Sequence, residues 1–313
     1  MYSGISYGLY CDFPSCRVSI DSVRLKFTYA LNSFVWSRGF SILSIDKMSF
    51  IIDNLQIAGA DFDVQWSYKD FFKIGAYCRT ARVSGCLPGT CEAWSFAIML
   101  GRYAYNASSH FLEPEIVMDF NPNKVPLSVI SKFLLLLRDG VKSVRVVRFD
   151  IAFDFPVARN DVYFVRSSDG RRAYRLFLDD GAKTEYQGAR GSHGALKIYD
   201  KTAESGLAVP VTRCEITVDG AKLSSLESLF PRLYCFVGYQ VDVSFSSLPF
   251  AVRACLLHPD LLDDMLASVS LNTRKKYLAL MDSMKECLLT VPDWSSVVSF
   301  AHNALNTYTG VRL

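Results

Sequence analysis

Three segments in the middle of the chain alternate, residue by residue, between apolar and charged or polar side chains. In residues 148–154 the even-numbered positions are arginine, aspartate, alanine and aspartate, whereas the odd-numbered ones are phenylalanine, isoleucine and phenylalanine. Residues 195–201 and 212–218 follow a similar pattern. Because successive side chains of a β-strand point to opposite faces, the pattern predicts strands that each have one apolar and one polar face. A sheet built from them needs helices over its apolar face only.

Strand and helix signals divide the chain into two parts. Alternation, or enrichment in β-branched and aromatic residues, predicts strands at residues 23–29, 96–105, 115–120, 143–155, 174–178, 184–187, 195–199 and 212–218. A helix is predicted at residues 126–138, because Pro126 suits a first helical turn and an Asp-Gly pair follows the last one. After Gly220 helical spacing predominates, at residues 221–238, 248–266, 273–289 and 294–306.

These signals predict an α+β fold with a curved, mainly antiparallel sheet, helices on one face and a helical C-terminal region. We expect residues 1–220 to form the sheet-based region and residues 221–313 the helical region, integrated with no clear linker between them. Residues 23–27 resemble residues 147–151 in pattern, and residues 115–119 resemble residues 213–217. The similarity fits two repeated α/β halves, and it fits chance equally well.

The composition excludes a disordered chain, since half of the residues are apolar. No apolar run approaches the roughly 18–20 residues of a membrane span, and no secretory signal opens the sequence. The nine cysteines are irregularly spaced, with no histidine near the two closest pairs. This favours reduced thiols over a zinc site or a disulfide framework. We therefore expect a cytoplasmic protein with no membrane partner.

The polar faces of the central strands carry residues with a shared chemical logic. If the strands are neighbours, one surface holds acids, cations and a phenol: Arg148, Asp150, Asp154, Lys197, Tyr199, Lys201, Arg213 and Glu215. Carboxylates on adjacent strands can hold a hard divalent cation, and a tyrosine can attack a phosphodiester that such an ion polarises. The other interpretation is a solvated face with cross-strand ion pairs, such as Asp150 with Arg213. Both remain open from the residues alone.

Other catalytic schemes fit the sequence less well. The four histidines include no two separated by a single residue, and the chain lacks both a G-x-S-x-G elbow and a P-loop. Gly188, Gly191 and Gly194 form a regularly spaced run, but it precedes a strand rather than a helix. The run is therefore predicted to make a hairpin turn and not a dinucleotide site.

Several motifs, in order along the chain, resemble one family. They are Met-Asp-Phe-Asn-Pro-Asn-Lys at 118–124, Arg-Phe-Asp-Ile-Ala-Phe-Asp-Phe at 148–155, Thr-Glu-Tyr-Gln-Gly-Ala-Arg-Gly-Ser at 184–192, Lys-Ile-Tyr-Asp-Lys at 197–201 with Glu204, Thr-Arg-Cys-Glu-Ile at 212–216 and Ser-Leu-Asn-Thr-Arg-Lys-Lys-Tyr at 270–277. The chain resembles the Rep_trans family, the replication initiators of rolling-circle plasmids of the staphylococcal type and their relatives in mobile elements. The resemblance runs from about residue 48 to about residue 284.

The resemblance implies a bacterial enzyme that works as a homodimer, binds a plasmid or mobile-element origin, and nicks and religates one DNA strand in a topoisomerase-like reaction. It implies Tyr199 as the nucleophile that forms a 5′-phosphotyrosine, with Tyr186 in support. Asp150 and Glu215 match the acids that hold Mg²⁺ or Mn²⁺, and Lys201 and Arg190 match cations near the phosphate.

The predicted partners are double- and single-stranded origin DNA, with a host helicase and polymerase as further candidates. In the C-terminal segment, Lys275 and Lys276 are expected to contact phosphates, and Asn272 and Arg274 to reach base edges. Two alternatives stay open: a relaxase of an integrative or conjugative element with the same chemistry, and a non-catalytic origin-binding protein. Whether Asp154 or Glu204 also acts in the site is not decided by the sequence.

Overall fold

The computed structural model describes residues 10–29, 61–68, 79–86, 93–106, 111–138, 141–165, 173–179, 182–235, 249, 259–283, 288–291 and 293–309. Within them an 11-stranded sheet dominates the molecule. Its strands are β1 (Tyr10–Asp12), β2 (Arg17–Tyr29), β3 (Asp61–Tyr68), β4 (Arg79–Cys86), β5 (Ala93–Asn106), β6 (Phe111–Phe120), β7 (Val141–Phe155), β9 (Tyr174–Asp179), β10 (Ala182–Gln187), β11 (Leu196–Asp200) and β12 (Thr212–Asp219). The mixed α+β class and the large antiparallel sheet confirm the predicted fold class.

The sheet consists of two halves with the same topology. The strand order is β3-β4-β5-β6-β2-β7-β12-β11-β10-β9, with β1 paired to β2. In each half the first long strand, β2 or β7, lies at the centre, and four strands then return from the outer edge as a meander. The segments at 23–27 and 147–151, whose patterns are similar, lie on these two central strands. The topology therefore repeats where the sequence pattern repeats.

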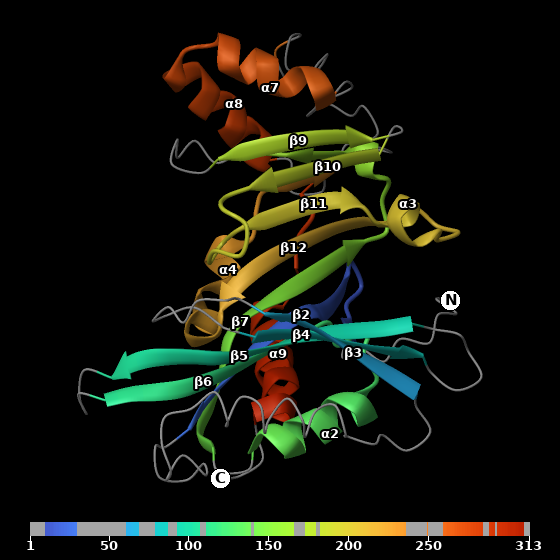
Figure 1. The fold of residues 1–313 in the computed structure, drawn as a ribbon. Helices are drawn as coiled ribbons and strands as arrows, with labels where there is room; N and C mark the ends of the chain where they lie inside the picture. The colour runs from blue at the N-terminus through green and yellow to red at the C-terminus, as the bar shows by residue number, and fades with distance from the viewer. Residues whose placement is uncertain are drawn as a thin grey trace, which may run out of the picture.

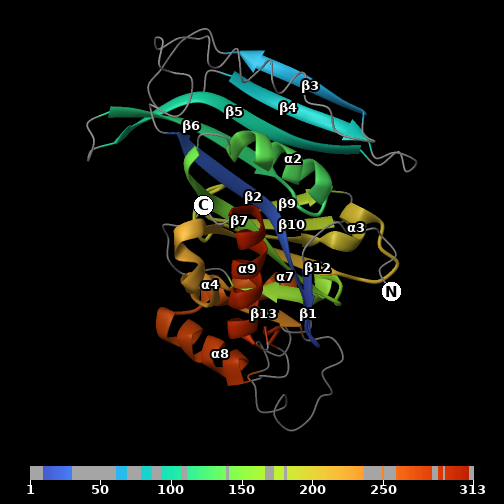
Figure 2. The same ribbon diagram turned by 90° about the horizontal axis from the view of Figure 1, so that it is seen from below.

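The sheet bends at its centre, so β9–β12 face the viewer in Figure 1 while β3–β6 are seen nearly edge-on. Four helical segments lie on the outer side of the bend (Figures 1 and 2): α2 (Leu127–Arg138), η3 (Gly220–Ser225), α4 (Leu226–Leu229) and α9 (Trp294–Thr309). The opposite face of the central strands has no described helix over it.

Apolar stripes on the helices explain why they cover that face. The predicted stripe of α2 is buried, and Phe133 meets Phe96 of β5 edge-on with ring centroids 4.8 Å apart. In α9, Tyr308 meets Phe120 of β6 in the same way, at 5.1 Å. Burying such aromatic side chains is the main favourable contribution to a core of this kind.

A second, smaller cluster lies beyond the main core. It contains a two-stranded sheet of β8 (Val162–Phe164) and β13 (Leu233–Cys235), with α7 (Pro259–Ser268) and α8 (Leu271–Ser283) packed on it. Its buried residues are Tyr163, Tyr234, Leu262, Leu266 and Met281. Figure 1 shows α7 and α8 at the end of the molecule beyond β9.

A buried ion pair ties the outer strands to the helix-covered side. Arg159 of η2 (Arg159–Asp161) and Glu185 of β10 are 1% and 3% exposed and contact each other. The Tyr174 hydroxyl of β9 donates to Glu185 Oε1 at 2.7 Å. Because an unpaired charge would be costly at this depth, the pair holds β10 and β9 in place.

All eight predicted strands are present, most of them longer than predicted, and the helix at 126–138 is confirmed as α2. Residues 221–238 are a correction: η3 and α4 are short, and β13 follows them. Leu233 and Tyr234 are fully buried because β13 pairs with β8, a distant strand, so helical spacing was misleading here. Part of the segment at 248–266 lies outside the described residues, and α7 occupies its end. The helix predicted at 273–289 corresponds to α8, whose described residues are Leu271–Ser283. The helix predicted at 294–306 is confirmed as α9.

Two further expectations concern thiols and membranes. In the described part of the chain Cys11, Cys16, Cys86, Cys214 and Cys235 are free thiols. Among the described helices, none combines the length and the apolar character that a membrane crossing requires.

Candidate functional site

The polar faces of β7, β12 and β11 come together on the open side of the sheet, because these strands are consecutive neighbours. Thr217 is opposite Asp150, and Glu215 is opposite both Ala152 and Lys197. The sequence analysis predicted one shared polar surface only if these strands are neighbours, and in the structure they are neighbours.

Tyr199 lies near the C-terminal end of β11 on this face and is buried, with 4% of its surface exposed. Its hydroxyl donates to Glu215 Oε1 at 2.7 Å, and the Lys197 ammonium lies 3.8 Å from the centroid of its ring. Burial, followed by the negative charge of Glu215, raises the pKa of the Tyr199 phenol above its ordinary value. The phenol is therefore neutral and hydrogen-bonded to a carboxylate.

Glu215 and Asp150 are the two predicted metal ligands. Burial and the nearby charge of Asp21 raise the pKa of Glu215 to about 7, although Lys197 and the Tyr199 hydrogen bond oppose this shift. Burial likewise raises the pKa of Asp150, whose Oδ1 accepts a 2.7 Å hydrogen bond from the Thr217 hydroxyl. The surroundings of both acids thus disfavour the charged form of the carboxyl group.

Asp21 is a third acid on this face that the sequence analysis missed. It sits at a bulge in β2, where the pairing with β7 skips from Ile20 to Ser22. Asn123 and Arg213 each contact its Oδ1 at 3.1 Å, and although burial acts against them they hold the pKa of Asp21 below its ordinary value. Two adjacent polar residues between Ile20 and Val23 were the only sequence signal of the bulge.

Arg213 does not pair with Asp150, so that expected ion pair is wrong. Its guanidinium contacts both carboxylate oxygens of Asp154, at 2.6 and 2.7 Å, and reaches Asp21. Asp154 lies directly opposite Arg213 in the β7–β12 register, which explains the choice of partner.

The two predicted phosphate-binding cations lie in different segments. Lys201 begins α3 (Lys201–Ser205) and pairs with Glu204 at 2.5 Å. Burial acts to raise the pKa of Glu204, but Lys201 and a hydrogen bond from Tyr199 lower it below its ordinary value. The hydrogen bond also shows that Glu204 adjoins the phenol. Arg190 instead is exposed in the turn between β10 and β11.

A pocket of about 540 Å³ opens on this face beside Tyr199. Both acids, the hydroxyl of Thr217 and the phenol of Tyr186 line it, together with four cations, Arg148, Arg175, Arg190 and Lys197. Tyr199 itself is not among the lining residues. The buried Nε of Arg148 has no hydrogen-bond partner among the described residues. Four cations and an unsatisfied donor make the pocket suitable for an anion.

The predicted hairpin turn forms one wall of the pocket. Gly188, Gly191 and Gly194 all have positive φ, at 91°, 75° and 76°, which other residues rarely adopt. The Arg148 guanidinium lies against Gly191 and donates to its carbonyl oxygen at 3.4 Å. A Cβ at Gly191 would come within 2.1 Å of Arg148 Nη1, so glycine leaves the space that the arginine occupies.

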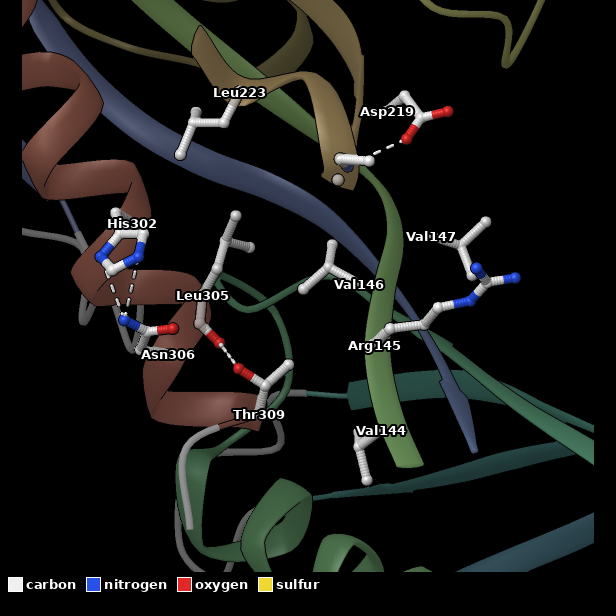
Figure 3. Close-up of a pocket in the computed structure, with 12 residues that line it drawn as sticks. Val144, Arg145, Val146, Val147, Asp219, Leu223, His302, Leu305, Asn306 and Thr309 are labelled. Atoms are coloured by element: carbon white, nitrogen blue, oxygen red, sulfur yellow. Dashed lines mark hydrogen bonds between the residues drawn. The ribbon is translucent and has the colours of Figure 1, made fainter. Parts of the chain in front are cut away.

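A second pocket, of about 440 Å³, lies on the helix-covered side between β7, η3 and α9. Figure 3 shows Val146 of β7 and Leu223 of η3 near Leu305 of α9, with His302 hydrogen-bonded to Asn306. None of the residues predicted from the sequence to act in the site lines this pocket. The pocket on the open face is therefore the candidate functional site.

The predicted origin-reading residues lie apart from that face. Asn272, Arg274, Lys275 and Lys276 belong to α8, which packs with α7 and the β8–β13 sheet. Asn272, Lys275 and Lys276 are exposed, whereas Arg274 is half-buried. Any DNA held by α8 and by the sheet face would therefore have to span both regions.

Comparisons with known proteins give structural similarity to solved structures. No family model and no curated protein matches the chain. A solved structure described as a rolling circle replication initiator protein from Geobacillus stearothermophilus is similar to it, with a TM-score of 0.32 and 16% sequence identity. The similarity covers 68% of this chain and 77% of the other.

Replacing Gly191 tests how Arg148 is held. Gly206, with φ of 61° and no atom within 4 Å of an added Cβ, is a matched control, because only the left-handed backbone penalises alanine there. We expect Gly206→Ala to lower the free energy of unfolding by about 1 kcal/mol in urea denaturation. Gly191→Ala should lower it by about 1.5–2 kcal/mol, because the flexible end of Arg148 moves aside and gives up its hydrogen bond to the Gly191 carbonyl oxygen. In an Arg148→Ala background the excess at Gly191 should disappear. Equal losses for the two glycines in wild type would contradict the packing argument.

Proposed function

We propose that this chain is a DNA strand-nicking and rejoining enzyme that initiates rolling-circle replication of a bacterial plasmid or mobile element. One observation carries the proposal: a phenol, Tyr199, is hydrogen-bonded to Glu215, which lines a pocket with Asp150 and four cations. A scissile phosphodiester needs cations for its non-bridging oxygens, a nucleophile and a base for that nucleophile. The motif resemblance supports the same assignment.

Glu215 is suited to take the Tyr199 proton. A carboxyl group with a pKa of about 7 is partly ionised at neutral pH and is an effective general base. The proton moves from Tyr199 Oη to Glu215 Oε1 as Oη forms a bond to phosphorus. The phosphorus–O3′ bond breaks, and the 3′ oxygen takes up a proton to become a free hydroxyl that primes a polymerase. Reversal of these steps rejoins the strand.

The burial of Tyr199 imposes a condition on this chemistry. Lys197 lies over its ring, and the Lys201–Glu204 pair adjoins its hydroxyl. The incoming phosphate attracts both lysines, so DNA binding draws these side chains away from the phenol. If this does not happen, Tyr186, which already lines the pocket, is the competing nucleophile.

The oxygen donors of the pocket suit Mg²⁺ or Mn²⁺. Asp150 and Glu215 would hold the ion. Mg²⁺ is commonly bound by one or two carboxylates together with substrate phosphates and water. Among the described residues, no three His, Cys, Asp or Glu side chains are grouped to hold an ion by themselves. When bound, the ion would stabilise negative charge on the phosphate oxygens.

Substituting the tyrosines tests the nucleophile. Tyr199→Phe should abolish covalent attachment to DNA while leaving binding nearly unchanged, because only the attacking oxygen is lost. The assay is incubation with a supercoiled plasmid that carries the gene and its flanking DNA, followed by detection of nicked, protein-linked product. Tyr186→Phe is the matched control and should retain attachment. The opposite result would assign the reaction to Tyr186, and no attachment by wild type would favour a non-catalytic DNA-binding protein.

Neutral amides in place of the two acids test the metal. Asp150→Asn should reduce Mg²⁺-dependent nicking by roughly two orders of magnitude or more, because it removes a charged ligand. Glu215→Gln should reduce it at least as much, because it removes both a ligand and the base for Tyr199. Asp154→Asn is the control, since Asp154 faces Arg213 and does not line the pocket. Full-rate nicking by wild type in excess EDTA would contradict the metal. Circular dichroism spectra of all three variants must match wild type.

Recognition of double-stranded DNA is assigned to α8, whose exposed Lys275 and Lys276 are cationic. We expect Lys275→Ala to weaken binding to every duplex sequence and to lower the salt slope of the binding constant by about one unit. Arg274→Ala or Asn272→Ala should instead reduce discrimination by about 1–3 kcal/mol per lost base contact. Fluorescence anisotropy on flanking-region and scrambled duplexes at two salt concentrations measures both effects. Unchanged binding by all three variants would move recognition away from α8.

A further inference from the structure

An aromatic side chain is exposed on the open face of the sheet, at its outer end. Phe177 of β9 is 53% exposed, and it lines the pocket on that face together with Tyr186 of β10. A single exposed ring on a protein surface is common and by itself indicates nothing. Phe177 differs because its ring meets the Tyr186 ring edge-on, with centroids 5.5 Å apart, so that two aromatic side chains lie together within a polar surface.

The strand register places these two rings close to the proposed nucleophile. Phe177 is opposite Thr184, and Thr184 is opposite Tyr199, so all three belong to one row that crosses β9, β10 and β11. Neighbouring strands are about 4.8 Å apart, which puts the backbones at Phe177 and Tyr199 roughly 10 Å apart. Tyr186 lies in the adjacent row, opposite Lys197. A DNA strand with its scissile phosphate at Tyr199 can therefore place a neighbouring nucleotide over Phe177 and Tyr186.

Positive charge accompanies the two rings. Arg175 is opposite Tyr186 in the β9–β10 register, and Arg190 follows β10 in the glycine turn. Both arginines are exposed, and both line the pocket. Cations beside exposed aromatic rings are the arrangement with which proteins hold single-stranded nucleic acid, because the cations bind phosphates and the rings stack on bases. The charge and the chemistry of this corner of the pocket therefore fit an unpaired nucleotide.

We propose that Phe177 and Tyr186 form a stacking platform for one base of a single DNA strand whose neighbouring phosphate lies at Tyr199. The inference rests on the proposed function, and it adds the form of DNA that the pocket accepts. A base inside a duplex is stacked on both of its faces, so only an unpaired or extruded base can stack on a protein side chain. An edge-to-face pair uses one face of one ring, and the remaining ring faces are left for a base.

The strand that carries Phe177 is anchored to the core. On the other face of β9 the Tyr174 hydroxyl donates to Glu185 at 2.7 Å, and Glu185 forms its buried ion pair with Arg159. A binding surface that is already in position gains affinity, because little conformational entropy is lost when the ligand arrives. Stacking tolerates all four bases, so the platform raises the affinity for a single strand and leaves the choice of sequence to the proposed α8 contacts.

Binding of a single strand with and without bases tests the platform. The probes are a fluorescent oligothymidine strand and an abasic strand of the same length and charge, and fluorescence anisotropy is measured in EDTA so that no Mg²⁺-dependent cleavage intervenes. Wild type should bind the base-bearing strand roughly ten-fold more tightly or better, because only that strand can stack. Phe177→Ala should lower the affinity for the base-bearing strand roughly ten-fold and leave the affinity for the abasic strand unchanged.

Matched variants separate stacking from other effects. Phe177→Leu keeps an apolar side chain without a ring and should behave like Phe177→Ala, whereas Phe177→Trp keeps a ring and should bind like wild type. Leu178→Ala is the control for position, because Leu178 is 72% exposed but points to the other face of β9. It should bind both strands like wild type. Circular dichroism confirms that each variant is folded.

The platform is overturned if wild type binds neither strand or binds both equally, if Phe177→Ala weakens both equally, or if Leu178→Ala has the same effect as Phe177→Ala. The nicking activity is judged separately, by protein-linked product. Ring-dependent binding by a wild type that forms no such product would contradict the nicking activity alone. A wild type that nicks DNA while Phe177→Ala binds oligothymidine equally well would contradict the platform alone.

Discussion

The pairing of β2 with β7 is the interaction on which the rest of the structure depends. These long central strands join the two halves of the sheet, and their apolar faces are fully buried beneath the helices. A slip of one residue would move Ile20 and Ile151 to the open face and the acids into the core, so the hydrophobic pattern fixes the register strongly. The bulge at Asp21 interrupts this pairing without shifting the faces of the strands, and it turns one extra carboxylate toward the open side.

Equivalent positions in the two halves carry different chemistry. By strand register Glu115, opposite Thr28, corresponds to Glu215, opposite Ala152. This match differs by two residues from the sequence match of 115–119 with 213–217. Next to Glu115 the first half has Lys26, which forms an ion pair with it, where the second half has Asp150. The first half therefore neutralises its acid internally, whereas the second half leaves two acids beside a pocket. The β5 position that corresponds to Tyr199 is Ala104, so the phenol too belongs to the second half alone.

Electrostatic balance explains how so many charges remain on one face. Arg213 compensates Asp154 and Asp21, and Lys201 compensates Glu204. Burial raises the pKa values of Asp150 and Glu215. Among the described residues, no cation pairs with either carboxylate as closely as Arg213 pairs with Asp154 or Lys201 with Glu204. The surplus of cations faces the pocket instead, where a bound anion would complete the balance. The same arrangement supports the proposed DNA chemistry.

The sequence by itself determined which residues form strands, which face of each strand is polar and which residues share that face. Alternation is a property of neighbouring residues, so it can be read without knowing any tertiary contact. The predicted roles of Tyr199, Asp150 and Glu215 came from motif resemblance and stay predictions. Only the tertiary structure decided that Asp21 joins the acids, that Arg213 pairs with Asp154, that Tyr199 is buried under Lys197, and that β8 pairs with β13. Each of these depends on strand order, on a bulge or on contacts between segments far apart in the chain, and local periodicity carries no information about them.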